Sequence, residues 1–105
     1  MTAKEFIYSL PGRANPDVLA DKETCFHFNL TGDGGGQFTV AVADGKMDVQ
    51  EGLVGEPKCE VRASEENFMK VIRGELNPMM ALMMGKVKIT NQGEMLKYAK
   101  VFGLM

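Results

Sequence analysis

Apolar and polar residues alternate along the chain with two different periods, and each change of period predicts a boundary between helix and strand. Near the start, apolar residues recur three and four positions apart, which predicts a short amphipathic helix that ends at Pro11-Gly12. Asn15-Pro16-Asp17 then has the composition of a helix start and predicts one further turn. The first stripe consists of Ala3, Phe6, Ile7 and Leu10.

From Thr24 onward every second residue is apolar, which is typical of strands with one buried face. Asp44-Gly45 is a two-residue turn signal, so the first three strands are expected to form a meander. We expect the opposite face of these strands to be polar and exposed to solvent. The predicted strands cover residues 24–30, 37–42, 46–50, 58–63 and 86–90.

Helical spacing returns in two segments of the second half. Ser64 is the expected N-cap of a helix that ends at Gly74, and Asn77-Pro78 starts a second helix. Residues 79–84 of that second helix are apolar on every side, so we expect it to be covered all round. A final helix is predicted from the stripe Met95, Leu96, Ala99 and Phe102.

These elements together predict an α+β fold. Five strands with one apolar face each form a mostly antiparallel sheet, which about five helices cover on that face. The 105 residues have the usual size of one domain, so residues 1–105 are expected to fold as a single unit.

Composition excludes several classes of protein. Apolar residues make up 45% and charged residues 25%, which is typical of folded chains and not of disordered ones. The net charge of -2 offers no general attraction for nucleic acid. Met1–Leu10 lacks the apolar stretch of a signal peptide, and the longest apolar run is too short to cross a bilayer. Cys25 and Cys59 are expected on opposite sheet faces without a disulfide, which favours a cytoplasmic location.

No pattern of catalytic or metal-ligating residues is visible. His27 is the one histidine, and its strand position puts it on the solvated face without an obvious partner. One histidine and two separated cysteines do not fit a zinc site, so no metal or other cofactor is predicted. Residues 31–36, Thr-Gly-Asp-Gly-Gly-Gly, join two strands and indicate a hairpin turn with positive φ angles, not a phosphate loop. The sequence therefore does not predict an enzyme.

Basic residues gather at the end of the chain. Residues 86–105 contain Lys86, Lys88, Lys97 and Lys100 against the single acid Glu94. A lipid head group, a coenzyme A phosphate or an anionic membrane could use this charge, but ordinary solvated lysines are the commoner explanation.

Methionine is unusually frequent, with nine residues against no tryptophan. Four methionines crowd one predicted helix together with Leu82, while Met69 and Met95 lie on the helices before and after it. Methionine side chains are flexible, so this helix indicates either a deformable wall around varied contents or ordinary core packing. The four are Met79, Met80, Met83 and Met84.

Several segments resemble the sterol carrier protein 2 family. They are Leu10-Pro11, Asn15-Pro16, residues 28–36 (FNLTGDGGG), residues 74–78 (GELNP) and residues 85–89 (GKVKI). Their order and spacing extend the resemblance over essentially the whole chain. The resemblance implies a twisted five-stranded sheet whose covering helices enclose an apolar tunnel for sterols, fatty acids or fatty acyl-coenzyme A.

The resemblance also implies which residues line that tunnel. Residues 76–84 would form one wall, the preceding helix a second wall, and the final helix a lid. Relatives often have glutamine where this chain has Met79 and Met84, and the peroxisomal ending of many relatives is absent from Phe102-Gly103-Leu104-Met105. The implied lining residues are Phe68, Met69, Ile72, Leu76, Met79, Met80, Leu82, Met83, Met84, Met95, Ala99 and Phe102.

The leading hypothesis is therefore a cytoplasmic, non-catalytic protein that binds an apolar small molecule (a fatty acid, acyl-coenzyme A or sterol-like ligand) and that could also transfer it. The alternative is a structural or interaction module that dimerises through its methionine-rich helix. Neither hypothesis requires nucleic acid, and membrane contact would be peripheral at most. A monomer and a homodimer are both compatible with the sequence.

Overall fold

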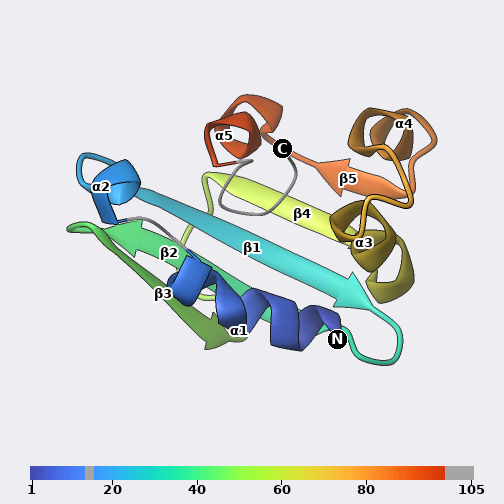
Figure 1. The fold of residues 1–105 in the computed structure, drawn as a ribbon, viewed down its shortest axis with the longest axis horizontal. Helices are drawn as coiled ribbons and strands as arrows, with labels where there is room; N and C mark the ends of the chain where they lie inside the picture. Colours follow the sequence, from blue (N-terminus) through green and yellow to red (C-terminus); the bar gives the residue numbers. More distant parts are fainter. Residues whose placement is uncertain (14–15, 99–105) are drawn as a thin grey trace.

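The computed structural model describes residues 1–13 and 16–98, which form an α+β structure with a five-stranded sheet (Figure 1). The α+β fold predicted from the sequence is confirmed. The helices are α1 (Ala3–Arg13), α2 (Pro16–Leu19), α3 (Glu65–Ile72), α4 (Pro78–Met83) and α5 (Gln92–Lys97). The strands are β1 (Thr24–Thr31), β2 (Gly36–Ala43), β3 (Lys46–Glu51), β4 (Cys59–Ser64) and β5 (Val87–Ile89).

The strands lie in the order β3-β2-β1-β4-β5. The first three strands form the predicted antiparallel meander, and β4 pairs with β5 in the same antiparallel way. The pairing of β1 with β4 is parallel, and it begins with Phe26 opposite Cys59. The sheet is thus mixed, and the short strand β5 forms one of its edges.

The apolar face of the sheet and the helices packed on it form the core. Alternate residues of β1 and β2 are buried on this face, as the period of two predicts. The Phe68 ring of α3 packs edge-on against Phe6 of α1 and Phe28 of β1, with both ring centroids 5.9 Å away. Since such aromatic pairs add about 0.5–1.5 kcal/mol to their burial, Phe68 joins both helices to the sheet.

The opposite face of the sheet is less exposed than the sequence suggested. His27 and Thr39 lie on it and are 5% and 2% exposed, because the segment after β3 folds back over them. His27 Nε2 is 2.9 Å from the carbonyl oxygen of Val54, and the Thr39 hydroxyl donates to Gly52 O and accepts from Val54 N. The expectation of a solvated His27 without a partner was therefore wrong; the loop between β3 and β4 supplies the partner.

Helix α1 continues beyond its predicted end and includes Pro11. Proline removes one donor, but Pro11 lies in the last turn of the helix, where a single lost bond costs little. The Ser9 hydroxyl donates to Phe6 O at 2.5 Å and accepts from Arg13 Nε at 3.0 Å, so side chains support this turn. The prediction that Pro11-Gly12 ends the helix was wrong for this reason.

The caps predicted for the middle helices are confirmed. Ser64 Oγ accepts from Asn67 N at 3.1 Å, and Asn77 Oδ1 accepts from Met79 N at 2.9 Å. Positive φ angles of 79° at Gly74 and 73° at Gly85 let the chain leave α3 and α4 in sharp turns. Cap residues visible in the sequence thus determine where both helices start and stop.

The glycine-rich segment between β1 and β2 is a hairpin turn, as predicted. Gly32, Gly34 and Gly36 have positive φ angles, which residues with a side chain rarely adopt. A Cβ atom on Gly35 would lie 2.4 Å from the carbonyl oxygen of Leu30, so the turn has no room for a side chain there.

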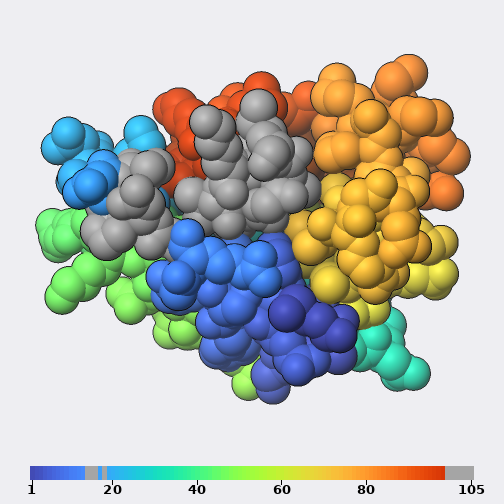
Figure 2. Space-filling model, viewed as in Figure 1, coloured from blue at the N-terminus to red at the C-terminus, as the bar shows by residue number. Residues whose placement is uncertain are grey.

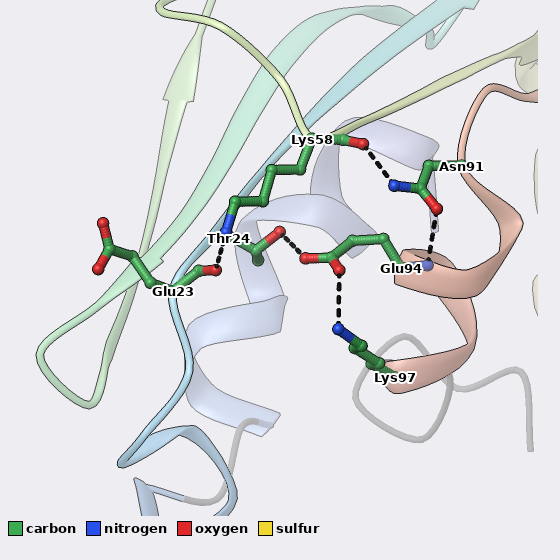
Figure 3. A network of polar contacts seen from close by, with 6 residues as sticks. All are labelled: Glu23, Thr24, Lys58, Asn91, Glu94 and Lys97. Carbon is green, nitrogen blue, oxygen red and sulfur yellow. Dashed lines mark hydrogen bonds and ion pairs between the residues drawn. The ribbon is translucent and has the colours of Figure 1, made fainter.

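A polar network holds α5 against the starts of β1 and β4 (Figure 3). The Thr24 hydroxyl donates to Glu94 Oε2 at 2.5 Å, and Lys97 Nζ lies 3.4 Å from Glu94 Oε1. Asn91 caps the helix by accepting from Glu94 N, and its amide donates to Lys58 O at 3.1 Å. The ammonium of Lys58 donates to Glu23 O at 3.0 Å. This network connects three segments that are far apart in sequence.

The same contacts change the acidity of Glu94. The hydrogen bond from Thr24 lowers the pKa of Glu94, and the neighbouring Lys97 lowers it further, against the opposing effect of burial. A carboxylate whose pKa is lower in the folded than in the unfolded state stabilises the fold once it is ionised in both. Its contribution is complete above the unfolded pKa of about 4.3 and is lost as pH falls through the folded pKa.

We predict that Glu94→Gln lowers the free energy of unfolding by about 1–2 kcal/mol at pH 7, because it weakens a charged, buried hydrogen bond. The difference in the free energy of unfolding between the variant and the unmodified chain should shrink as pH falls below about 4. Chemical denaturation followed by circular dichroism at pH 7 and pH 3 measures both effects. Glu66→Gln is the matched control, since Glu66 makes a 3.4 Å ion pair with Lys70 on an exposed surface and should change stability by less than about 0.5 kcal/mol. Equal effects of the two substitutions at pH 7 would contradict the role of Glu94.

Candidate functional site

An apolar pocket lies between the sheet and the helices of the second half of the chain. Its volume is about 40 Å³, and every side chain around it is apolar or aromatic. It is bounded by β4 and β5 on the sheet side and by α3, α4 and α5 on the helix side. The lining residues are Val61, Phe68, Val71, Pro78, Ala81, Val87, Ile89 and Met95.

The strands place three of these residues by their pairing. Val61 of β4 is paired with Ile89 of β5, and Val87 is paired with Ala63 two positions further along β4. Because side chains alternate between the faces of a strand, Val61, Val87 and Ile89 all point to the helix side. Together they form the floor of the pocket.

On α3 and on α4, the two residues that line the pocket are three positions apart. Phe68 and Val71 lie three positions apart on α3, and Pro78 and Ala81 lie three positions apart on α4, so each pair shares one helix face. Ala81 is 1% exposed and has the smallest side chain around the pocket. Its size lets α4 approach the sheet closely, and α4 thus forms the outer wall of the pocket.

The pocket is small compared with a lipid. Its volume of about 40 Å³ is near the share of one water molecule in the liquid, about 30 Å³. Pockets that enclose drug-sized ligands usually measure about 300–1,000 Å³. A long acyl chain or a sterol therefore fits only after part of the wall has moved.

The structure brings half of the predicted lining residues to this region. Phe68 and Met95 line the pocket, and Met69 is buried in the adjoining core. Ile72 and Leu76 are partly buried and pack against the same core. Leu82, on α4, is also partly buried.

The three methionines of α4 and its C-cap Met84 lie on the outer side of the helix. Met79, Met80, Met83 and Met84 are between 55% and 84% exposed, and none of them lines the pocket. The expectation that this helix is covered on every side was therefore wrong. The physical reason is its position beside the edge strand β5, where it has the sheet on one side only. Ala99 and Phe102, the remaining predicted lining residues, lie outside the described residues.

The sequence analysis missed four of the lining residues, although the signals for them were present. Val61, Val87 and Ile89 are the apolar members of two alternating strands, and Val71 belongs to the predicted stripe of α3. Pro78 and Ala81 fall within the wall of residues 76–84 that the family resemblance implies, but they were not named among its lining residues, because the surrounding methionines are larger. A test for which face of α4 carries the smallest residues would have found them.

A polar hollow lies at the network of Glu94. It contains charges of both signs, and Tyr98 forms part of its wall. Burial and the neighbouring Glu94 carboxylate raise the pKa of Tyr98, whose ring packs edge-on against Phe26 with centroids 5.4 Å apart. The hollow is lined by Asp21, Lys22, Glu23, Lys58, Glu94, Lys97 and Tyr98.

Within residues 1–13 and 16–98, no cluster of three or more histidine, cysteine, aspartate or glutamate side chains is arranged to hold a metal ion. The helices in these ranges also include none with the length and apolar character needed to cross a bilayer.

Comparison with known proteins shows similarity over nearly the whole chain. Hydroxysteroid dehydrogenase-like protein 2 of Danio rerio is 32% identical over 106 aligned positions, which cover 96% of this chain and 25% of that protein. This chain therefore spans about a quarter of the length of that curated relative.

Two solved structures have the same fold. Palmitated SCP2L2 from Aedes aegypti superposes with a TM-score of 0.72 at 23% identity, covering 97% of this chain and 95% of that one. The inverting sec-alkylsulfatase Pisa1 from Pseudomonas sp. contains a similar region, with a TM-score of 0.76 at 18% identity over 100% of this chain and 16% of that one. The model of the SCP-2 sterol transfer family matches residues 6–105, and the chain belongs to this family.

Proposed function

We propose that this chain binds an apolar lipid in the pocket beneath α4 and carries it without catalysing a reaction. The observation that supports this most directly is the wholly apolar lining of a pocket between sheet and helices in a member of the SCP-2 sterol transfer family. A fatty acid, a fatty acyl-coenzyme A or a sterol-like molecule has the matching chemistry. In this proposal residues 1–105 act as one lipid-binding domain.

Burial of the acyl chain supplies the main favourable free energy for such binding. Removing about 15 methylene groups from water gives a gross term near 12 kcal/mol, at about 0.8 kcal/mol each. Association costs about 4–15 kcal/mol, and moving the wall adds to this cost. At the lower limit of this cost about 8 kcal/mol remains, which corresponds to a Kd near 1 μM, so micromolar affinity requires both the association cost and the cost of moving the wall to be small.

Helix α4 is the element that would move to admit the ligand. It has six residues, and Ala81 is its one buried residue, so shifting it outward breaks few apolar contacts. By contrast, α3 is held by the rings around Phe68, and α5 is held by the network of Glu94. The wall with the weakest attachment therefore separates the pocket from solvent.

The ligand would contact the residues that already face this region. We propose Phe68, Met69, Ile72, Leu76, Leu82 and Met95 as lining residues of the enlarged pocket. The lining role of Met79, Met80, Met83 and Met84 stays a prediction that requires α4 to turn, and the roles of Ala99 and Phe102 stay predictions from the family resemblance. The free cysteines Cys25 and Cys59 are compatible with the predicted cytoplasmic location.

We predict that Ala81→Leu weakens fatty-acid binding at least tenfold, because the larger side chain fills the pocket and closes the approach of α4 to the sheet. Titration with a naturally fluorescent polyene fatty acid measures the affinity. Ala43→Leu is the matched control, since Ala43 is exposed at the end of β2 and far from the pocket in the sheet order. A circular dichroism melt checks that both variants fold. Unchanged affinity in folded Ala81→Leu would refute the pocket as the lipid site.

We also predict opposite effects of Val87→Ala on stability and on binding. Removing two buried methyl groups should lower the free energy of unfolding by about 1–3 kcal/mol, while the enlarged pocket should keep or increase the affinity for fatty acid. Saturating fatty acid should raise the Tm of this variant, as for any ligand of the folded state. Val54→Ala, at an exposed valine, should change neither property. A loss of affinity in Val87→Ala would count against a ligand beneath α4.

A further inference from the structure

The face of the sheet opposite the helices carries exposed polar side chains where β1 and β4 end. On the side seen in Figure 2, helices α1 (blue) and α3 (gold) cover much of the sheet. On the opposite side, the loop between β3 and β4 covers His27 and Thr39. Thr31, four positions beyond His27 on β1, is exposed. This end of the polar face is therefore accessible to a ligand.

One row of side chains crosses three strands on this face. Asn29 of β1 is paired with Arg62 of β4, and Arg62 is paired with Lys88 of β5. Val87 and Ile89, on either side of Lys88, line the apolar pocket on the helix side, so Lys88 points to the opposite face. Because neighbouring strands are about 4.8 Å apart, the long side chains of Arg62 and Lys88 can reach one small ligand.

A second row lies next to the first. Thr31 is paired with Ser64, two positions beyond the first row on both strands. Lys86, two positions before Lys88, continues the antiparallel register of β4 and β5 and comes opposite Ser64. Both rows line one open hollow, whose lining residues are Asn29, Thr31, Arg62, Ala63, Ser64, Gly85, Lys86 and Lys88.

The lining of this hollow is positively charged. It contains three basic side chains and no acidic one. Arg62 Nε contacts a carboxylate oxygen of Glu60, and the other N–H groups of the guanidinium can bind a second partner. In the part of the chain that the structure describes, neither Lys86 nor Lys88 takes part in an ion pair, and both are exposed. Two ammonium groups and part of a guanidinium are thus available to an anion.

Acidic side chains beside the hollow limit the kind of anion that fits. Thr31 and Ser64 also belong to the wall of a neighbouring hollow. The acids of that second hollow are Asp33, Glu65 and Glu66. Their charges repel a ligand with several negative groups in a row, so a long polyanion such as nucleic acid is disfavoured. A compact ligand with one anionic group fits the basic hollow better.

We propose that this hollow binds the phosphate group of a soluble phosphorylated small molecule. A phosphate monoester carries up to two negative charges and three acceptor oxygens, which one guanidinium and two ammonium groups can match. The hydroxyl of Thr31 can donate to the same group. Ser64 Oγ accepts from Asn67 N at 3.1 Å, and its O–H can donate as well. A carboxylate has one charge and two oxygens and would use fewer of these donors.

The proposed phosphate site is separate from the lipid pocket. Val61, Val87 and Ile89 face the pocket, whereas Arg62 and Lys88 face the hollow. The sheet lies between the two sites, so phosphate binding needs no lipid in the pocket and does not rest on the proposed lipid binding.

A bilayer surface is a poorer ligand for this face. Interfacial binding requires apolar side chains that enter the boundary between head groups and acyl chains. The apolar members of the lining are Ala63 and Gly85, which are too small for that role. The chemistry of the hollow therefore favours a soluble phosphate.

The test is a nuclear magnetic resonance titration of the ¹⁵N-labelled full chain with inorganic phosphate and with glycerol 3-phosphate. Sodium chloride at the same ionic strength is the reference. We expect saturable shifts of the amide signals of Thr31, Ser64, Lys86 and Lys88. The Kd should be about 1–10 mM, because exposed ion pairs contribute little each.

Two variants test the charges and the hydroxyl separately. Lys86→Gln with Lys88→Gln removes both available ammonium groups and should raise the Kd for glycerol 3-phosphate about fivefold or more. Thr31→Val removes one hydroxyl without a change of charge and should raise this Kd about threefold. A general attraction to a basic surface would respond to the first variant and not to the second.

The matched control is Lys4→Gln with Lys46→Gln, which removes two exposed lysines from α1 and β3. It should leave the Kd within about twofold of that of the unmodified chain, because salt screens charges beyond about 10 Å. A circular dichroism melt checks that each variant folds. Fatty-acid affinity should be the same in all of them, so a failure of the phosphate site and a failure of the lipid pocket give different results.

Four results would overturn the proposal. They are amide shifts no larger than those with sodium chloride, equal losses in the control and in the Lys86 and Lys88 variant, an unchanged Kd in folded Thr31→Val, and binding to phosphatidic acid vesicles without binding to glycerol 3-phosphate. The last result would assign this face of the sheet to a lipid surface.

Discussion

The parallel pairing of β1 with β4 is the constraint on which the rest of the structure depends. Parallel neighbours cannot be joined by a tight turn, so the chain must return to the start of β1 before β4 can begin. It does so through β2, β3 and a loop whose backbone at Gly52 and Val54 bonds to Thr39 and His27. The loop between β3 and β4 therefore buries polar residues on the face of the sheet opposite the helices. It also sets Val61 beside Phe28, which extends the apolar floor toward the pocket.

The pocket lies between this floor and three helices that are held in place to different degrees. Phe68 holds α3 by two ring contacts, and Glu94 holds α5 by a charged network whose acid has a lowered pKa. Helix α4 has neither the ring contacts nor the charged network, and it packs on the sheet through Ala81. A site whose volume without ligand is far below that of its ligand must be able to enlarge. It therefore needs stably packed elements and one element that can move.

Much of this arrangement could be predicted from the sequence, and the failures have physical causes. Alternation in β1 and β2 identified the buried face, and Ser64 and Asn77 identified two helix starts, because these signals are local. The parallel pairing, the burial of His27 and the turn of α4 depend on contacts between distant segments, which periodicity does not record. Six apolar residues in a row could not show which side of α4 faces the sheet; that choice follows from the small size of Ala81 and from the place of β5 at the sheet edge.

The most direct test of a lipid site beneath α4 is nuclear magnetic resonance of the protein with a ¹³C-labelled fatty acid. Nuclear Overhauser contacts between acyl protons and protein methyl groups report which side chains lie within about 5 Å of the chain, a reach close to that of ordinary apolar contact. The account predicts contacts to the methyl groups of Val61, Ala81 and Val87. Contacts confined to the outer methionines Met83 and Met84 at saturating fatty acid would contradict it.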